Sequence, residues 1–371
     1  MYKLRVVATV VWLFFLSSLV LLPFANADWS MFRSDTSHIG VGTGNPALTP
    51  TLLWNYTTFY DGGGHVYSSP AVVNSVVYIS SWDFKVINKT LFPNVGSVFA
   101  LNAANGAKLW NYTTGPVMTS SPAIVGGVVY IGSLDGNVYA LNATNGAKLW
   151  NYNTGSAVYS SPAVVGGVVY IGSNNGNVYA LNTANGAKLW NYTIPWYSNH
   201  GNYVYSSPAV ASGVVYVGSY NDGIYALNAT NGAKLWNYTT GSEVGSSPAV
   251  VGGVVYVGSN DDNEYAFNAT SGAKLWSYKT DGVAGSPAVV GGVVYIGGGN
   301  NVYALGSSPT SSPSSSSSNA LPIIVGVVAA VVIVALVILL VFKKRLKTKP
   351  TSPESPMQNS TFVFSVPIFP R

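Results

Sequence analysis

Cysteine is absent from this sequence, and only three histidines are present. The chain can therefore form no disulfide, and a thiolate nucleophile, a Cys-ligated zinc and an iron–sulfur cluster are all excluded. Charged residues are also scarce, at 8% of the total. We therefore expect Asn, Ser, Thr, Gly and Tyr to cover much of the surface.

The net charge of +5 does not describe the main part of the chain. Lys3 and Arg5 stand near the start, and six more basic residues follow position 342. The segment between them carries nine basic and eleven acidic residues and is close to neutral. Nucleic-acid-binding domains concentrate Lys and Arg on one face, so we expect no nucleic-acid partner.

A unit of about forty residues repeats along the chain, as in stacked or radial folds. One copy runs from Ser160 to Tyr192. Its Ser-Pro-Ala signal recurs with the proline at Pro70, Pro122, Pro162, Pro208, Pro248 and Pro287. Its closing tryptophan recurs at Trp110, Trp150, Trp190, Trp236 and Trp276, and Trp54 precedes the first copy.

Each unit contains four short runs with the residues of β-strands. In the chosen copy they are Pro162–Val165, Val168–Gly172, Val178–Leu181 and Lys188–Tyr192. Gly166-Gly167 supplies a two-residue hairpin turn, and Asn and Gly fill the other turns. Four antiparallel strands per unit of about forty residues predict one blade of a β-propeller. The repeated aromatics then pack between blades.

The two ends of the repeat array are complementary. The last unit begins at Pro287 and stops near Leu305 without a tryptophan run, whereas Leu52–Tyr56 is such a run without a unit. We predict an all-β fold at residues 51–305: a six-bladed β-propeller of four-stranded antiparallel blades. The N-terminal strand Leu52–Tyr56 closes the ring by pairing with Val302–Leu305, which leaves few sheet edges exposed.

Residues before the repeats read as an export signal and a lead-in. Residues 1–27 combine basic residues, an apolar run and the small-residue site Ala25-Asn26-Ala27, as in a signal peptide. The apolar run is long, so an uncleaved anchor is the alternative. Residues 28–50 form an irregular lead-in segment.

Residues after the repeats predict a membrane anchor. A Ser/Pro/Thr-rich stalk at 306–320 precedes a continuous apolar run at 321–342, which is long enough for one transmembrane helix. Basic residues follow at once, which places the tail at 343–371 in the cytoplasm. We therefore predict a single-pass protein of the cell membrane with its propeller outside.

The outer segment is rich in Asn-x-Ser/Thr sequons, which mark glycosylation of exposed sites in exported proteins. Simple copying of the repeat is the alternative explanation for their number. The candidates are Asn55, Asn88, Asn111, Asn142, Asn191, Asn228, Asn237 and Asn268.

Three inserts break the repeat, at Phe59–Val66, Ser81–Gly96 and Ile194–Tyr203. Each falls in a connection from second to third strand or from fourth strand to the next blade, and these connections share one face. The chain leaves the ring after a third strand, so this face points away from the membrane. Loop faces of repeat proteins commonly carry binding sites.

The inserts supply the candidate binding residues. Exposed aromatics suit stacking on a sugar or docking of a protein, although local packing of the rim explains them equally well. A His/Asp metal site is a weaker alternative to solvated polar side chains. The candidates for a partner-binding face are Tyr60, His65, Trp82, Phe84, Trp196, Tyr197 and His200.

The unit resembles the pyrroloquinoline-quinone-like β-propeller repeat. The signature of that repeat is Ala-x-Asp-x-x-x-Gly-x-x-x-Trp, which here reads Ala140, Asn142, Gly146 and Trp150. Quinone dehydrogenases with this repeat have more blades, a calcium site of Glu, Asn and Asp, and often a vicinal cysteine pair. This sequence has no cysteine, and we find no candidate set of calcium ligands. The resemblance therefore implies the fold and not the redox site, as in a propeller lipoprotein of outer-membrane assembly that acts as a scaffold.

These observations favour a binding or scaffold module at the cell surface for a protein or glycan partner. We expect no enzyme activity, no catalytic residue, no metal and no cofactor. One alternative is a surface quinone-dependent oxidoreductase, which the repeat resemblance suggests. Another is a hydrolase or lyase that acts on polysaccharide. The serines recur in nearly every unit, so none is distinguished as a nucleophile beside a base.

Overall fold

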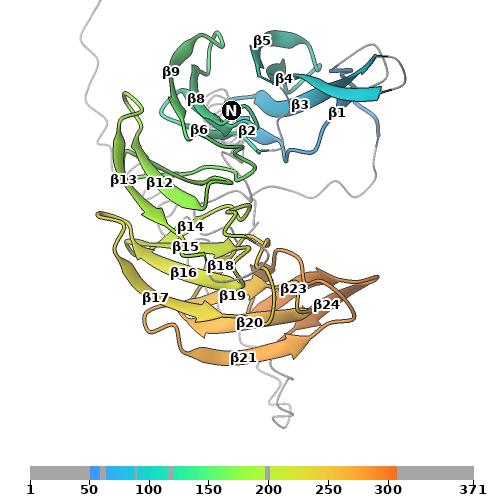
Figure 1. The fold of residues 1–371 in the computed structure, drawn as a ribbon. Coiled ribbons are helices and arrows are strands. Elements are labelled where there is room, and N and C mark those ends of the chain that lie inside the picture. Colours follow the sequence, from blue (N-terminus) through green and yellow to red (C-terminus); the bar gives the residue numbers. More distant parts are fainter. Residues whose placement is uncertain (1–50, 59–63, 88–89, 116–119, 197–200, 307–371) are drawn as a thin grey trace, which may run out of the picture. The chain divides into compact units, whose positions relative to one another are not determined.

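The computed structural model describes residues 51–58, 64–87, 90–115, 120–196 and 201–306, with only the backbone for 83–94. In this part of the chain every regular element is a β-strand, and the strands form six antiparallel sheets in sequence order (Figure 1). The predicted all-β architecture of repeated four-stranded sheets is confirmed. The signal peptide, lead-in, stalk, membrane span and tail lie outside the described residues.

Four of the sheets have four strands each, joined in chain order by hairpins. The second sheet has β6 (Ala123–Val125), β7 (Val128–Gly132), β8 (Asn137–Asn142) and β9 (Lys148–Asn153). The third has β10 (Ala163–Val165), β11 (Val168–Gly172), β12 (Asn177–Asn182) and β13 (Lys188–Thr193). The fourth has β14 (Ala209–Ala211), β15 (Val214–Ser219), β16 (Gly223–Asn228) and β17 (Lys234–Thr239). The fifth has β18 (Ala249–Val251), β19 (Val254–Gly258), β20 (Asn263–Asn268) and β21 (Lys274–Lys279).

The first and last sheets depart from this pattern. The first has five strands: β1 (Gly64–His65), β2 (Ala71–Val73), β3 (Val76–Ile87), β4 (Thr90–Asn102) and β5 (Lys108–Thr114). The last has three: β22 (Ala288–Val290), β23 (Val293–Gly298) and β24 (Asn301–Leu305). The insert expected at Ser81–Gly96 extends β3 and β4, whose ladder continues to the pair Ile87–Thr90 across a bulge at Asp83/Phe84.

The turn between the first two strands depends on left-handed backbone. Gly166 and Gly167 adopt φ values of 59° and 79°, which glycine reaches without steric cost and which match the twist of a tight hairpin. Asn74 and Ser75 adopt the same region in the first sheet. The turn places Ala163 opposite Tyr170 and so fixes the register of the innermost strand.

The core lies between sheets, because each short sheet buries its faces only against its neighbours. Tyr130 and Trp150 of the second sheet pack with Val164, Ile171 and Leu181 of the third. All five are buried. A single sheet of this size could not remain folded alone, which is why repetition is required.

The two serines of the Ser-Ser-Pro signal have different tasks. The first fastens its own sheet: Ser160 Oγ accepts the backbone N–H of Gly172 at 3.1 Å. The second joins neighbouring sheets: Ser121 N–H donates to Ser161 Oγ at 2.9 Å, and Ser161 N–H donates to Ser207 Oγ at 2.9 Å. The same link recurs from Ser69 to Ser121, from Ser207 to Ser247 and from Ser247 to Ser286.

The tryptophan that ends a unit anchors that unit to the next one in four of the units. Trp150 Nε1–H donates to the Thr183 carbonyl at 2.9 Å, and a Cβ added to Gly186 would lie 2.6 Å from the Trp150 ring. The Tyr130 hydroxyl donates to the same carbonyl at 3.2 Å. This contact explains the spacing of glycine and tryptophan in the repeat, since the glycine of one unit makes room for the tryptophan of the preceding unit. The other tryptophans in this contact are Trp54, Trp110, Trp190 and Trp236.

The segment Leu52–Tyr56, expected as the closing strand, contacts the first sheet and does not pair with the last sheet. Trp54 donates to the Ala103 carbonyl at 2.9 Å and packs on Gly106, as the other tryptophans do on the sheets that follow them. Leu52–Tyr56 is not a strand, however, and within the described residues it does not pair with β24. Val302 of β24 is 83% exposed. The expected ladder from 52–56 to 302–305 is therefore wrong for this structure, because the segment is held by the first sheet alone.

No helix within the described residues is long and apolar enough to cross a bilayer. The predicted span at 321–342 is not among those residues.

We predict that Gly146→Ala destabilises the protein more than Gly126→Ala. Both glycines have positive φ, but a Cβ at 146 would lie 2.6 Å from the Trp110 ring, whereas none of the described atoms lies within 4 Å of a Cβ at 126. Strain in this region costs an ordinary residue about 1–2 kcal/mol, and Gly146→Ala adds displacement of the tryptophan. Urea unfolding of both variants measures the difference, and equal losses would refute the anchoring role.

Candidate functional site

Two kinds of connection lie together at one end of the sheets, as the sequence predicted. One kind joins the second and third strands of a sheet, and the other leads from the fourth strand to the next sheet. Asn174, between β11 and β12, donates its N–H to the Ala157 carbonyl in the β9–β10 connection at 2.9 Å. Tyr220, between β15 and β16, donates its N–H to the Tyr203 carbonyl in the β13–β14 connection at 3.0 Å. We call this end the loop end, and the opposite end with the double-glycine turns the glycine end.

Two of the predicted site residues come together at the loop end. His65 and Trp82 lie opposite each other in the β1–β3 ladder, and their ring centroids are 5.3 Å apart. Tyr67 stacks with both, at 5.6 Å from His65 and 5.7 Å from Trp82. Tyr67 was not predicted, although it directly precedes a Ser-Ser-Pro signal, and it is 63% exposed. These three rings form the first aromatic group.

The remaining predicted residues lie elsewhere or cannot be placed. Trp196 follows β13 and is 68% exposed, and it takes no part in the first aromatic group. Phe84 belongs to β3, whose side chains beyond Trp82 are not described. Tyr60, Tyr197 and His200 lie outside the described residues.

Sequence reasoning missed a larger group, which we call the tyrosine cluster: Tyr159, Tyr203, Tyr205 and Tyr220. The Tyr205 ring meets Tyr159 at 4.7 Å and Tyr220 at 4.6 Å, both nearly edge to face. Tyr203 lies 6.1 Å from Tyr205 and 6.5 Å from Tyr220. The available signal was the residue before Ser-Ser-Pro, which is Tyr at 67, 159 and 205, Thr at 119 and Gly at 245.

Gly245 is part of the tyrosine cluster's geometry. It occupies the position that Tyr205 holds in the preceding unit, and a Cβ there would lie 3.2 Å from the Tyr220 ring. The Tyr220 ring therefore lies over a position kept free of a side chain. Burial, followed by the neighbouring Tyr205 and the Glu243 carboxylate, raises the pKa of the Tyr220 hydroxyl.

An Asp or Asn in each second turn ties the loop end together. Asp135 accepts the Tyr139 hydroxyl at 2.7 Å and the Gly115 N–H at 2.9 Å. Asp261 accepts the Tyr265 hydroxyl at 2.6 Å and the Gly241 N–H at 2.7 Å. Burial alone would raise the pKa of each carboxyl, but these hydrogen bonds outweigh it and lower the pKa below its ordinary value. Both carboxylates serve structure.

Glu264 departs from the repeat in a different way. Its position in β20 is Val in β8 and β12 and Ile in β16, and the glutamate side chain is fully buried. The solvated carboxylate that a charged strand residue suggests is therefore not what the structure shows. Within the described residues, no group of three or more His, Cys, Asp and Glu could hold a metal ion.

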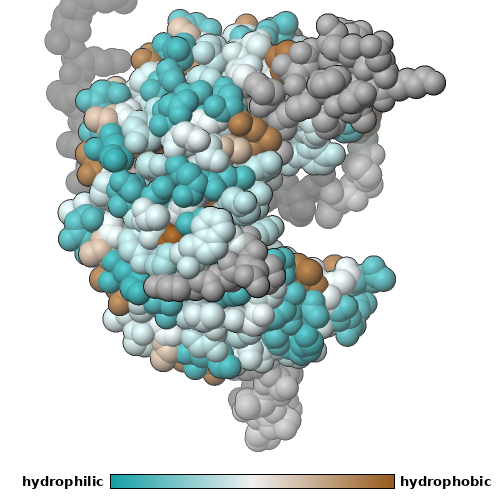
Figure 2. Space-filling model, viewed as in Figure 1, coloured by the Kyte–Doolittle hydropathy of each residue, from teal (hydrophilic) through white to brown (hydrophobic). Residues whose placement is uncertain are grey.

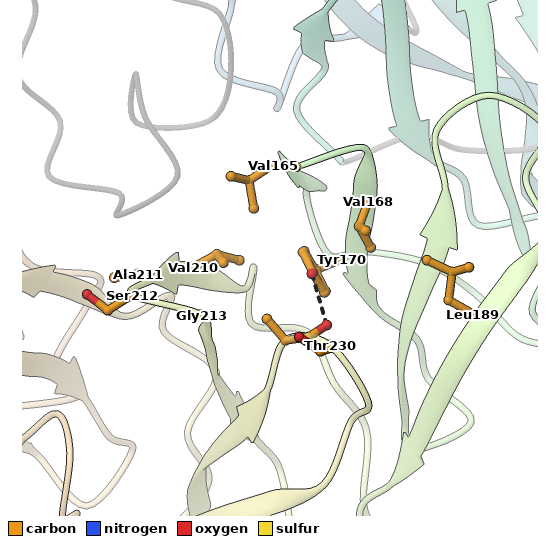
Figure 3. A pocket seen from close by; sticks show the side chains of 11 residues that line it. Val165, Val168, Tyr170, Leu189, Val210, Ala211, Ser212, Gly213 and Thr230 are labelled. Atoms are coloured by element: carbon orange, nitrogen blue, oxygen red, sulfur yellow. Dashed lines mark hydrogen bonds between the residues drawn. The ribbon is translucent and has the colours of Figure 1, made fainter.

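A shallow groove lies at the glycine end, between the third and fourth sheets (Figure 3). It has a volume of about 770 Å³, and its walls include Val165, Tyr170, Leu189, Val210 and Ala211. The Tyr170 hydroxyl donates to the Ala229 carbonyl at 3.0 Å. None of the lining residues is an acid, a base or a histidine.

The sequon asparagines fall into two environments. Asn142, Asn228 and Asn268 are half-buried, and their Oδ1 atoms accept backbone N–H groups in the third turn, as Asn142 does from Thr144 at 2.9 Å. Asn55, Asn111, Asn191 and Asn237 are exposed. Asn88 lies outside the described residues. Attachment of glycans stays a prediction.

Comparison with known families decides the classification. The sequence profile described as outer membrane protein assembly factor BamB matches residues 47–204 and 193–311. The chain belongs to this family of quinone-type propeller repeats. A comparison with curated protein sequences gives no match.

Solved structures of this fold include BamB and quinohemoprotein alcohol dehydrogenases. BamB from Moraxella catarrhalis is 22% identical with a TM-score of 0.55, over 69% of this chain and 74% of that protein. Quinohemoprotein alcohol dehydrogenase ADHIIG from Pseudomonas putida HK5 is 18% identical with a TM-score of 0.56, over 73% of this chain and 56% of the enzyme. The enzyme from Comamonas testosteroni is 17% identical with a TM-score of 0.52, over 73% and 58%. This chain thus spans little more than half of either enzyme, and at such identities the likeness shows the fold.

Among the described residues, no group of three or more His, Cys, Asp and Glu offers ligands for the calcium of the dehydrogenases. The sequence has no cysteine for a vicinal pair, and the acidic turn residues Asp135 and Asp261 already accept hydrogen bonds from a tyrosine and from backbone groups. We therefore derive no reaction step through a quinone.

We predict that in the double variant Asp135→Asn/Asp261→Asn the free energy of unfolding depends less on pH in the acid range. Because the folded-state pKa lies below the ordinary 3.8, these carboxylates stabilise the fold above about pH 3.8 and lose that contribution as the pH falls through the folded value. The double variant should be less stable at pH 7, and its deficit should shrink below pH 4.

Urea unfolding between pH 7 and pH 3 measures this deficit. Asn175→Asp is the reverse control, because Asn175 holds the same position in the third sheet and contacts Tyr179 at 2.8 Å. It should introduce a new loss of stability in acid. A deficit that stays constant with pH would contradict the assignment.

Proposed function

We propose that the protein is a non-catalytic binding or scaffold module at the cell surface, which engages a protein or glycan partner through the loop end. The first aromatic group carries this proposal. His65, Tyr67 and Trp82 stack side by side where the repeat is broken, in a five-stranded sheet that the other units lack. The family description, an outer-membrane assembly factor, supports a role in holding other proteins.

Exposed aromatics are suited to this task. Tyr and Trp bury large areas with little loss of side-chain freedom, and they dominate the energetics of many interfaces. On the face shown in Figure 2, most of the surface is polar or of intermediate hydropathy, and the apolar patches are small and separated from one another. Tyr67 at 63% and Trp196 at 68% exposure are the large aromatics that a partner would cover.

The proposed module is anchored and exported. A signal peptide at 1–27, a stalk at 306–320, one membrane span at 321–342 and a cytoplasmic tail at 343–371 follow from composition. Glycans on the exposed outer-strand asparagines Asn55, Asn111, Asn191 and Asn237 would leave the aromatic loop end free.

A partner-capture experiment tests the function. Full-length protein carrying Trp82→Ala/Trp196→Ala should lose at least nine-tenths of the partners that cross-linking and mass spectrometry recover with the wild type. Leu149→Ala, which alters a half-exposed residue of β9, should keep them. An identical partner set for all three would refute the role of the aromatics, and a soluble wild-type chain that needs no detergent would refute the anchor.

A further inference from the structure

The tyrosine cluster is separate from the first aromatic group and from the predicted site residues. Its members come from the β9–β10, β13–β14 and β15–β16 connections. It therefore spans successive units, and Gly245 of the following unit gives Tyr220 its place. Tyr203 is 38% exposed, and the other three rings are partly exposed at the same end.

The ring geometry presents a stepped platform. Tyr205 touches Tyr159 and Tyr220 at 4.7 and 4.6 Å with interplanar angles of 69° and 68°, so these rings fill the space between them. A cage for an organic cation needs rings that stand apart around an empty centre. Closely packed rings instead offer their outer faces and edges in differing orientations to a ligand that lies across them.

Polar groups beside the rings are neutral or acidic. The Asn174 amide lies 3.4 Å from the Tyr205 hydroxyl, and Glu243 accepts Ser242 at 2.5 Å and lies 3.4 Å from the Asn260 amide. The sequence of the connections that carry these groups, at 154–162, 173–176, 194–208, 219–222, 240–247 and 259–262, contains no Lys or Arg. Lys279 of β21 contacts the connection at 259–262, but its Nζ is paired with Asp262 at 3.1 Å. The scarcity of unpaired positive charge on these connections disfavours anionic ligands.

We propose that the tyrosine cluster binds a neutral oligosaccharide. The apolar face of a pyranose presents slightly positive C–H groups, which the negative face of a tyrosine ring attracts. Sugar hydroxyls can exchange hydrogen bonds with the phenol groups, with Asn174 and Asn260, and with Glu243. Successive sugar rings of a chain would lie on successive steps of the platform. The inference names a ligand class for the loop end, and it does not depend on the first aromatic group.

Titration calorimetry with chitohexaose, cellohexaose and mannohexaose tests the proposal on the full chain in detergent. The wild type should bind at least one of the three. Tyr203→Ala/Tyr220→Ala should weaken that binding about tenfold or more, because two stacking faces are lost. Tyr203→Phe/Tyr220→Phe keeps the rings and should stay within about threefold of the wild type. Thermal unfolding of each variant checks that the fold is retained.

Three results would overturn the proposal: no binding of any of the three oligosaccharides, undiminished binding by the folded alanine variant, or displacement of the bound sugar by choline, which would identify a cation site. Trp82→Ala/Trp196→Ala should leave sugar binding unchanged. If that variant loses its captured partners and still binds the sugar, both assignments stand. If it keeps its partners while Tyr203→Ala/Tyr220→Ala loses the sugar, only the scaffold role at the first aromatic group fails.

Discussion

Contacts that cross from one repeat to the next hold this protein together. Four tryptophans that end units each pack on a glycine of the following unit and donate to a carbonyl beside it, as Trp150 does with Gly186 and Thr183. At the innermost strands, a backbone N–H of one unit donates to a serine of the next. Since each sheet has only three to five short strands, these links and the apolar packing between sheets provide stability that no sheet could reach alone.

This arrangement separates stability from recognition. The residues of the inter-unit contacts recur with little change, whereas the residue before Ser-Ser-Pro varies freely among Tyr, Thr and Gly. Variation at that position and in the neighbouring turns creates two different aromatic surfaces at the loop end without altering the contacts that hold the sheets together. Gly245 shows how closely such changes are coupled, because loss of a side chain in one unit accommodates Tyr220 of the unit before it.

Scarcity of charge is compensated by local hydrogen bonding. Asp135 and Asp261 hold the positions that Asn175 and Asn221 hold elsewhere, and each contacts the tyrosine four residues on. Acid and amide both reach the tyrosine, but the carboxylates of Asp135 and Asp261 accept its hydroxyl group, whereas the amides of Asn175 and Asn221 donate to it. Glu264 places a carboxyl group at a fully buried position that holds Val or Ile in the three preceding sheets.

Strand boundaries and the sheet repeat were predictable from the sequence because they depend on local chemistry. Double-glycine turns, β-branched runs and Asn-Gly turns determine where strands such as Val168–Gly172 begin and end, and all of these signals lie within a few residues of the strand. The sequence could place His65 and Trp82 on the same face, since both fall where the repeat is broken. The tertiary structure alone decided that Tyr67 joins them, that Tyr159 meets Tyr205 across a unit, and that the insert after Ser81 continues the ladder. It also decided that Leu52–Tyr56 docks on the first sheet through Trp54 and does not pair with β24. These outcomes depend on how sheets stack over separations of many residues, and no local pattern specifies that geometry.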